Sequence, residues 1–304
     1  MTITANIDRT TNIPEDWRKT VLPAPPSVKI SLDDNCQFRC NFCTSRLQPD
    51  KAEMDWEMFT RLIDELAFHG TKEIGLFYIG EPMLAKRLVD AVRYCKEAGI
   101  EYVFITTNGH LATKAKVQDL MEAGLDSLKF SFNYADGWQI KAVAGVSPSV
   151  YGKIVQNIKD AWEVKQRGYS CGIYASSILF DGAQGEAMKK AVAEILPFVD
   201  EHYWLPCFSF GGQTDMGKVQ GNPGRLDRMR EPLPCWAGFR EGHVTASGKV
   251  SFCCFDSHDR WVLGDLRDMT FMEAWNSAKA QRLREAHLRK DVSGTECENC
   301  AVGG

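Results

Sequence analysis

The chain has 304 residues, of which 44% are hydrophobic and 25% are charged. This composition is typical of a globular protein and excludes disordered, collagen-like and disulfide-stabilised miniature proteins. The 36 basic and 40 acidic residues leave a net charge of −4 without a long run of either sign, so nucleic acid is not an expected partner. No apolar stretch is long enough to span a membrane and the N-terminus is not a secretory signal, so we expect a cytoplasmic protein with no membrane partner.

Residues 1–26 are polar and end in a proline-rich stretch, which predicts an N-terminal extension. From residue 27 onward, β-type runs alternate with amphipathic helical patterns. The predicted strands are 27–32, 72–80, 101–109, 126–134, 170–180 and 201–210. The predicted helices between them are 56–66, 84–92, 114–123, 148–167 and 185–197, with Gly70, Gly99, Gly124 and Gly168 as C-terminal caps.

This alternation requires crossover connections and therefore a mostly parallel sheet, with ligands at the carboxyl ends of the strands. Six strand–helix units are too few to close a full barrel. The fold class expected for residues 27–210 is therefore α/β, with the strands forming a partial (β/α)6 barrel.

The stretch 211–234 is rich in glycine and proline and predicts a linker. Residues 235–304 then form a small second domain in this prediction. It contains a hairpin at 243–255, with its turn at Ser247 and Gly248, and one amphipathic helix at 271–287.

Three cysteines, Cys36, Cys40 and Cys43, follow the first predicted strand in the pattern C-x3-C-x2-C. Three thiolates on one short loop can bind one metal centre. A zinc site normally has a fourth protein ligand close by, whereas an iron–sulfur cube with three protein ligands leaves one iron open to an exchangeable ligand. A structural zinc loop remains the alternative.

This motif, with the aromatic residue Phe42 before the last cysteine, resembles the signature of the radical S-adenosylmethionine (SAM) superfamily. The resemblance covers about residues 27–210. It implies that the three cysteines hold a 4Fe-4S cluster whose open iron binds SAM. Reductive cleavage by an external one-electron donor, such as flavodoxin or ferredoxin, would then give a 5′-deoxyadenosyl radical.

The same resemblance implies further SAM-binding residues. The superfamily's GGEP motif reads IGEP here, with Gly80 and Glu81 kept and an isoleucine in place of the first glycine. The glycine permits close backbone approach, and the carboxylate suits an ammonium group. Asn108 after the third strand, and Ser131 and Asn133 at the end of the fourth, match positions that contact the ribose or carboxylate. Ordinary turn or capping roles are the alternative for these three.

A second set of cysteines comprises Cys235, Cys253, Cys254, Cys297 and Cys300. With the string from Leu263 to Ser277, residues 235–301 are similar to the SPASM-type extension of radical SAM enzymes, in its shortened twitch form. This implies one auxiliary 4Fe-4S cluster, although four thiolates would also suit zinc. The spacings resemble those of a twitch-type aminocyclitol dehydrogenase, which favours Cys235, Cys253, Cys297 and Cys300 as ligands.

Cys254 is then a fifth thiol, expected to point away from Cys253 because neighbouring side chains in a strand face opposite ways. An S–H bond is weaker than most C–H bonds, so Cys254 is a candidate hydrogen-atom donor, and the expected reaction is epimerisation of a carbon centre. One alternative is a dehydrogenase that passes electrons to the auxiliary cluster. Another alternative is a non-catalytic iron–sulfur or zinc protein. A small buried apolar role for Cys254 is common for such residues.

The expected substrate is an aminoglycoside-like or sugar-like molecule or a peptide. Many peptide-modifying relatives carry an additional N-terminal domain that binds a leader peptide. Only about 26 residues precede the first predicted strand here, which favours the small molecule.

Overall fold

The computed structural model describes residues 3–48, 51–180, 182–205, 233–256, 258–298 and 300. The strands are β1 (Ser27–Ile30), β2 (Glu73–Gly75), β3 (Tyr102–Thr107), β4 (Ser127–Ser131), β5 (Gly172–Ile178), β6 (Glu201–Leu205), β7 (Glu241–Val244), β8 (Lys249–Ser251) and β9 (Val262–Asp265). The α-helices are α1 (Ile3–Thr11), α2 (Trp56–Phe68), α3 (Leu88–Glu97), α4 (Lys114–Glu122), α5 (Gly137–Ala144), α6 (Ser149–Lys165), α7 (Gly182–Ile195), α8 (Ala237–Arg240), α9 (Phe271–Trp275) and α10 (Ala278–Leu288).

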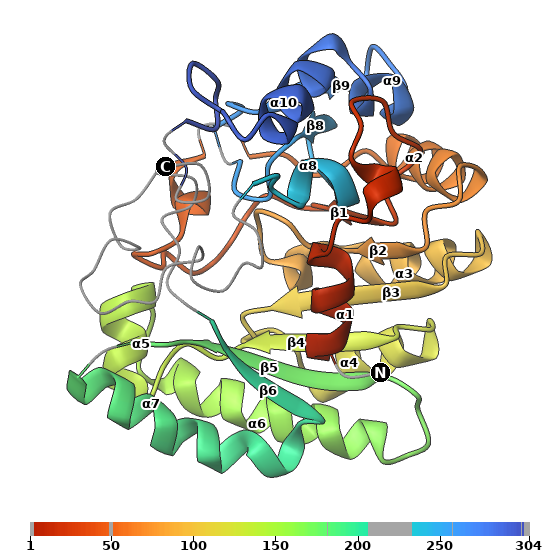
Figure 1. Cartoon of the computed structure of the whole chain (residues 1–304). Helices are drawn as coiled ribbons and strands as arrows, with labels where there is room; N and C mark the ends of the chain where they lie inside the picture. The colour runs from red at the N-terminus through yellow and green to blue at the C-terminus, as the bar shows by residue number, and fades with distance from the viewer. Residues whose placement is uncertain are drawn as a thin grey trace.

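The strands form one nine-stranded sheet in the order β6-β5-β4-β3-β2-β1-β7-β8-β9. Strands β1 to β6 pair in parallel, each with its neighbour in the chain. Helices follow each of these strands up to β5, and Figure 1 shows them around the outside of the curved sheet. The predicted α/β fold with a partial barrel is therefore confirmed.

Strand β3 shows why the two faces of this sheet differ. Its side chains alternate, with Val103 and Ile105 fully buried toward the helices, while Tyr102, Phe104 and Thr106 face the inside of the barrel and line a cavity there. Alternation with a period of two is what a strand with one apolar and one functional face requires. The barrel interior is therefore lined with aromatic and polar groups.

The glycines predicted to end helices adopt backbone angles that other residues rarely take. Gly70, Gly99, Gly124 and Gly168 have φ values of 85°, 89°, 99° and 106°, in the left-handed region that closes a helix without a Cβ penalty. These caps set where each crossover turns back into the sheet.

The C-terminal segment continues the same sheet. Strand β7 pairs in parallel with β1, from Ser27 opposite Glu241 to Ile30 opposite Val244, and β7 and β8 form the predicted antiparallel hairpin. The guanidinium of Arg284, which is fully buried, donates to the carbonyl oxygens of Thr20, Gly238 and Trp275, each at 2.8 Å. This side chain ties the N-terminal arm to the C-terminal helices.

Several predictions need correction or fall outside the described residues. The single helix predicted at 271–287 is wrong, because Ser277 caps a new helix by accepting a hydrogen bond from the backbone of Ala280, which leaves α9 and α10 separate. Helices α1, α5 and α8 and strand β9 were not predicted. The second half of the predicted strand 201–210 and most of the predicted linker 211–234 lie outside the described residues.

Helix α1 crosses the strands on the inner side of the barrel (Figure 1). It is held at both ends by carboxylates of the sheet, since the backbone N–H of Ile3 donates to Glu201 at 2.8 Å and Arg9 pairs with Glu73. In the part of the chain that the structure describes, every helix is too short or too polar to cross a bilayer.

Candidate functional site

The loop after β1 carries Cys36, Cys40 and Cys43. Burial raises the pKa of Cys36 to about 11 and that of Cys40 to about 12, and the neighbouring thiols add to the shift in both cases. The Tyr134 hydroxyl lies 3.1 Å from the Cys40 sulfur. A bound cation would stabilise these buried thiols as thiolates, as it does at a metal centre.

The donor set of this loop bears on the kind of metal centre. A structural zinc site normally has four protein ligands around one point, whereas a 4Fe-4S cluster with three thiolate ligands leaves one iron open to an exchangeable ligand. A donor set of three thiols fits such a cluster.

The IGEP loop packs directly against the backbone that leads into the cysteine loop. The backbone N–H of Glu81 donates to the carbonyl of Asn35 at 2.8 Å. A Cβ placed on Gly80 would lie 2.0 Å from the carbonyl oxygen of Asp33. The close backbone approach expected at Gly80 is therefore present in the structure, and it is made toward the cysteine loop.

We expect Gly80→Ala to destabilise the fold by about 1–3 kcal/mol, because the clash is with backbone that cannot rotate away. Thermal unfolding followed by circular dichroism measures the change. Gly152→Ala, on α6 where an added Cβ meets nothing within 4 Å, is the control and should stabilise by about 0.5–1 kcal/mol. Equal melting temperatures for Gly80→Ala and the unmodified protein would contradict the expectation.

Glu81 holds two loops together. Its carboxylate is buried and accepts hydrogen bonds from the Thr107 hydroxyl at 2.5 Å, from the Asn108 backbone at 2.8 Å and from the Met83 backbone at 3.1 Å. Burial raises the pKa of Glu81, although these donors oppose the shift. The carboxylate positions Asn108, and its role toward an ammonium group stays a prediction.

The other predicted SAM-binding residues divide into two groups. Asn108 is brought to the cysteine loop, with its amide nitrogen 3.9 Å from the Cys36 sulfur and its amide oxygen accepting from Gln37 at 3.3 Å. Ser131 is half-buried at the carboxyl end of β4. Asn133 instead accepts a hydrogen bond from the backbone of Ile178 at 3.0 Å, which is a structural use of its side chain. Phe42 is buried in the main core.

The five C-terminal cysteines come together around one small apolar cavity. A space of about 20 Å³ is lined by Cys235, Cys253, Cys254, Cys297 and Cys300, with Phe252, Trp261 and His287. The pKa of Cys297 is raised to about 12 by burial and then by the neighbouring Cys235 and Cys300. The pKa of Cys253 is raised well above its ordinary value by the hydrogen bond with Cys254 and by burial. These contacts fit the four-thiol set predicted for an auxiliary cluster.

Cys253 and Cys254 were expected to point in opposite directions because both were placed in an extended strand. In the structure that strand ends before them. Strand β8 ends at Ser251, and the chain then turns, with the Asp256 backbone N–H donating to the Cys253 carbonyl at 3.3 Å. The premise of an extended strand is therefore wrong. Tyr78, which the sequence analysis did not single out although it lies just before IGEP, donates to the Cys253 carbonyl at 2.7 Å.

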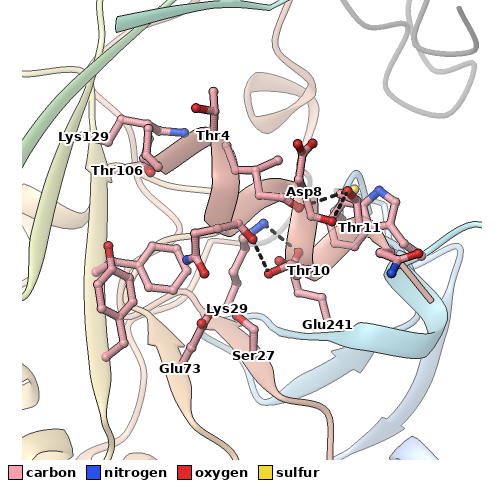
Figure 2. A pocket seen from close by; sticks show the side chains of 18 of the residues that line it. Thr4, Asp8, Thr10, Thr11, Ser27, Lys29, Glu73, Thr106, Lys129 and Glu241 are labelled. Carbon is pink, nitrogen blue, oxygen red and sulfur yellow. Dashed lines mark hydrogen bonds and ion pairs between the residues drawn. The ribbon is translucent and has the colours of Figure 1, made fainter. Parts of the chain in front are cut away.

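A cavity of about 730 Å³ occupies the inside of the barrel beneath α1 (Figure 2). It is lined by α1, by inward residues of β1, β2, β3, β4, β6 and β7, and by Cys254. None of the predicted SAM-binding residues lines it. Because Cys254 also lines the small cysteine cavity, this thiol lies at the boundary between the two spaces.

One wall of the large cavity carries a paired set of charges. The Lys29 ammonium lies 2.6 Å from Glu241, and the His243 ring nitrogen Nε2 lies 2.7 Å from the same carboxylate oxygen. Burial opposes ionisation of Glu241, but Lys29 and His243 outweigh it and lower its pKa to about 2. Glu241 is therefore ionised at neutral pH and neutralised from within the protein.

Comparison with known proteins agrees with this arrangement. Residues 30–174 match the model of the radical SAM superfamily, and residues 235–301 match that of SPASM, an iron–sulfur cluster-binding domain. The chain belongs to the radical SAM superfamily and carries a C-terminal SPASM-type domain.

Among individual relatives, the PqqA peptide cyclase of Methylobacterium nodulans is 33% identical over 127 residues, which is 41% of this chain and 33% of that protein. The GTP 3′,8-cyclase of Limosilactobacillus fermentum is 40% identical over 112 residues, 35% of this chain and 33% of that protein. The match therefore spans about a third of the length of these curated relatives.

Two solved structures share the fold. BtrN in complex with AdoMet and 2-DOIA has a TM-score of 0.63 at 17% identity, covering 93% of this chain and 94% of that one. Streptococcus suis SuiB bound to the precursor peptide SuiA has a TM-score of 0.69 at 15% identity, covering 98% and 72%. At these identities the likeness concerns the fold alone.

Proposed function

We propose that this radical SAM enzyme epimerises a carbon centre of its substrate, with Cys254 as the hydrogen-atom donor. Cys36, Cys40 and Cys43 would hold the SAM-binding 4Fe-4S cluster, and Cys235, Cys253, Cys297 and Cys300 an auxiliary one. SAM bound at the first cluster would supply a 5′-deoxyadenosyl radical, to which the substrate would lose a hydrogen atom. The proposed domain division places the first site in residues 27–210 and the second in 235–304.

The observation that carries this proposal is the position of Cys254. Its side chain lines both the large barrel cavity and the cavity of the other four C-terminal cysteines. A thiol that only filled space in the core would have no reason to face the cavity where a substrate fits. The turn after β8, held by the Tyr78 hydroxyl and by Asp256, positions this thiol at the cavity wall.

The proposed exchange balances atoms and electrons. The substrate carbon loses one hydrogen atom to the deoxyadenosyl radical and gains one from the Cys254 S–H, so the S–H bond breaks and a new C–H bond forms on the opposite face. The sulfur radical left behind takes one electron from an external low-potential donor of the flavodoxin or ferredoxin class, and one proton from water. The substrate therefore shows no net oxidation.

The cavity sets a size for the substrate. A volume of about 730 Å³ is that of an ordinary small-molecule site, so it accepts a sugar-like molecule or one to a few residues of a peptide. The similar proteins include a peptide cyclase and a protein whose structure was solved with a precursor peptide bound. A peptide therefore stays in the proposal as an alternative to the small molecule.

Anaerobic reaction in deuterium oxide tests the function. The iron-reconstituted protein is incubated with SAM, a strong reductant and a panel of amino sugars, sugar acids and short peptides, and products are analysed by mass spectrometry and NMR. We expect 5′-deoxyadenosine and one deuterium at an inverted carbon, because the Cys254 proton exchanges with solvent. A product lighter by two mass units would indicate a dehydrogenase instead, and an absence of SAM cleavage would indicate a non-catalytic protein.

A further inference from the structure

One end of the barrel cavity carries a lysine ammonium that is not paired with a carboxylate of the described residues. Thr106 on β3 and Lys129 on β4 are paired in register, and both line the cavity. Figure 2 shows them together, beside Thr4 of α1 and away from Lys29, Glu73 and Glu241 at the other end. Two adjacent strands therefore present a hydroxyl and an ammonium to the same space.

The charge of Lys129 distinguishes it from the other cations of this cavity. Lys29 is paired with Glu241 and Arg18 with Glu15, but Lys129 forms no ion pair with any residue that the structure describes. Glu201 lies two strands away from Lys129, in register with it across β5. Its carboxylate accepts a hydrogen bond from the backbone N–H of Ile3, the first residue of α1. The Lys129 ammonium lies 5.6 Å from the centre of the Tyr203 ring, and an anion of the substrate would give it a charged partner.

Two hydroxyl groups accompany this ammonium. Lys129 Nζ donates to the Tyr203 hydroxyl oxygen at 3.0 Å, so the hydrogen of that hydroxyl remains available for donation to another acceptor. The Thr106 hydroxyl makes no hydrogen bond within the described ranges of the chain. The three groups can together donate to the oxygen atoms of one anion.

We propose that Lys129, Thr106 and Tyr203 form the subsite for an anionic group of the substrate, a carboxylate or a phosphate. This inference rests on the proposed function and narrows its substrate class. It favours a sugar acid, a sugar phosphate or an acidic peptide residue over a polycationic aminoglycoside, which the ammonium would repel.

The position of the subsite assigns it to the substrate rather than to SAM. Thr106 and Lys129 each precede a predicted SAM-binding residue, Asn108 and Ser131, by two positions in the chain. Two residues of a strand span roughly 7 Å. The anion would therefore lie one row deeper in the barrel than the predicted cofactor residues, inside the cavity that Cys254 also lines.

Anion binding to the iron-reconstituted protein tests the subsite without a known substrate. Sodium acetate and sodium phosphate are compared with sodium chloride at equal ionic strength, with SAM present in saturating amount so that its own carboxylate site is filled. Ligands that bind only the folded state raise its melting temperature. The acetate and phosphate series separate a carboxylate from a phosphate subsite.

We expect at least one of these anions to stabilise the protein beyond chloride, and Lys129→Gln to weaken this binding by about tenfold or more. Thr106→Val, which keeps the β-branched shape, should weaken it to a smaller extent. Lys153→Gln, an exposed lysine on α6, is the matched control and should bind as the unmodified protein does.

The inference is overturned if neither anion stabilises the unmodified protein beyond chloride, or if Lys129→Gln and Thr106→Val both retain its affinity. SAM cleavage without substrate is measured in parallel on the unmodified protein and should be unchanged in the control Lys153→Gln. Failure of the unmodified protein to cleave SAM contradicts the proposed function, whereas loss of the anion effect alone contradicts only the subsite.

Discussion

Replacing Cys254 by serine is expected to abolish deuterium incorporation at the inverted carbon while SAM cleavage continues. Serine keeps the size and polarity of the side chain, but an O–H bond is too strong to give a hydrogen atom to a carbon radical. Deoxyadenosine should then accumulate without epimerised product. Measuring both products in deuterium oxide separates this uncoupling from a loss of cofactor binding.

The neighbouring thiol provides the control for Cys254→Ser. Cys253 is proposed as a ligand, so Cys253→Ser should lose auxiliary iron, whereas Cys254→Ser should retain the iron content of the unmodified protein. Both side chains line the same small cavity, so general damage to that cavity would lower iron in both variants. Full epimerisation by Cys254→Ser would exclude this thiol as the donor. Iron loss in Cys254→Ser but not in Cys253→Ser would indicate that Cys254 is the cluster ligand and Cys253 the fifth thiol.

Replacing Cys40 by alanine is expected to abolish SAM cleavage and to lower the iron content from about 8 to about 4 atoms per chain. Cys40 lies between the other two cysteines of the loop in sequence and contacts Tyr134, so its replacement leaves two of the three proposed cluster ligands. Iron analysis and deoxyadenosine production, with and without substrate, measure the two effects.

The second cysteine set supplies the matched variant. Cys300→Ala should lose a similar amount of iron, because its thiol lines the auxiliary cavity, but it should still cleave SAM under strong reduction. Deoxyadenosine production by Cys40→Ala at the rate of the unmodified protein would rule out the N-terminal loop as the SAM-binding site. If the unmodified protein contained about four iron atoms per chain and zinc in addition, the auxiliary iron–sulfur cluster would no longer be part of the proposal.

Features that depend only on residues close together in the chain were predictable from the sequence. The C-x3-C-x2-C loop depends on residues close in the chain, and so do the strand alternation of Tyr102 to Thr107 and the positive φ of the helix-ending glycines. Each follows from spacing and from backbone sterics within a few residues. The partial barrel followed because repeated strand–helix units of this length have few ways to pack.

Contacts between distant segments were not predictable in the same way. The engagement of Glu81 by Thr107 and Asn108, the pairing of Asn133 with the backbone of Ile178 and the turn at Cys253 each depend on what a remote strand or loop presents. The same holds for α1, whose polar sequence does not reveal that it closes the inner side of the barrel.

By itself, the sequence determined the fold class, the superfamily and the two sets of cysteines, because these depend on local periodicity and ligand spacing. Only the tertiary structure decided that Cys254 lies at the boundary of two cavities and that Lys129 has no internal counter-charge among the described residues. The reason is physical: whether a thiol is accessible or an ammonium is paired depends on groups far along the chain, and only folding brings those groups within reach.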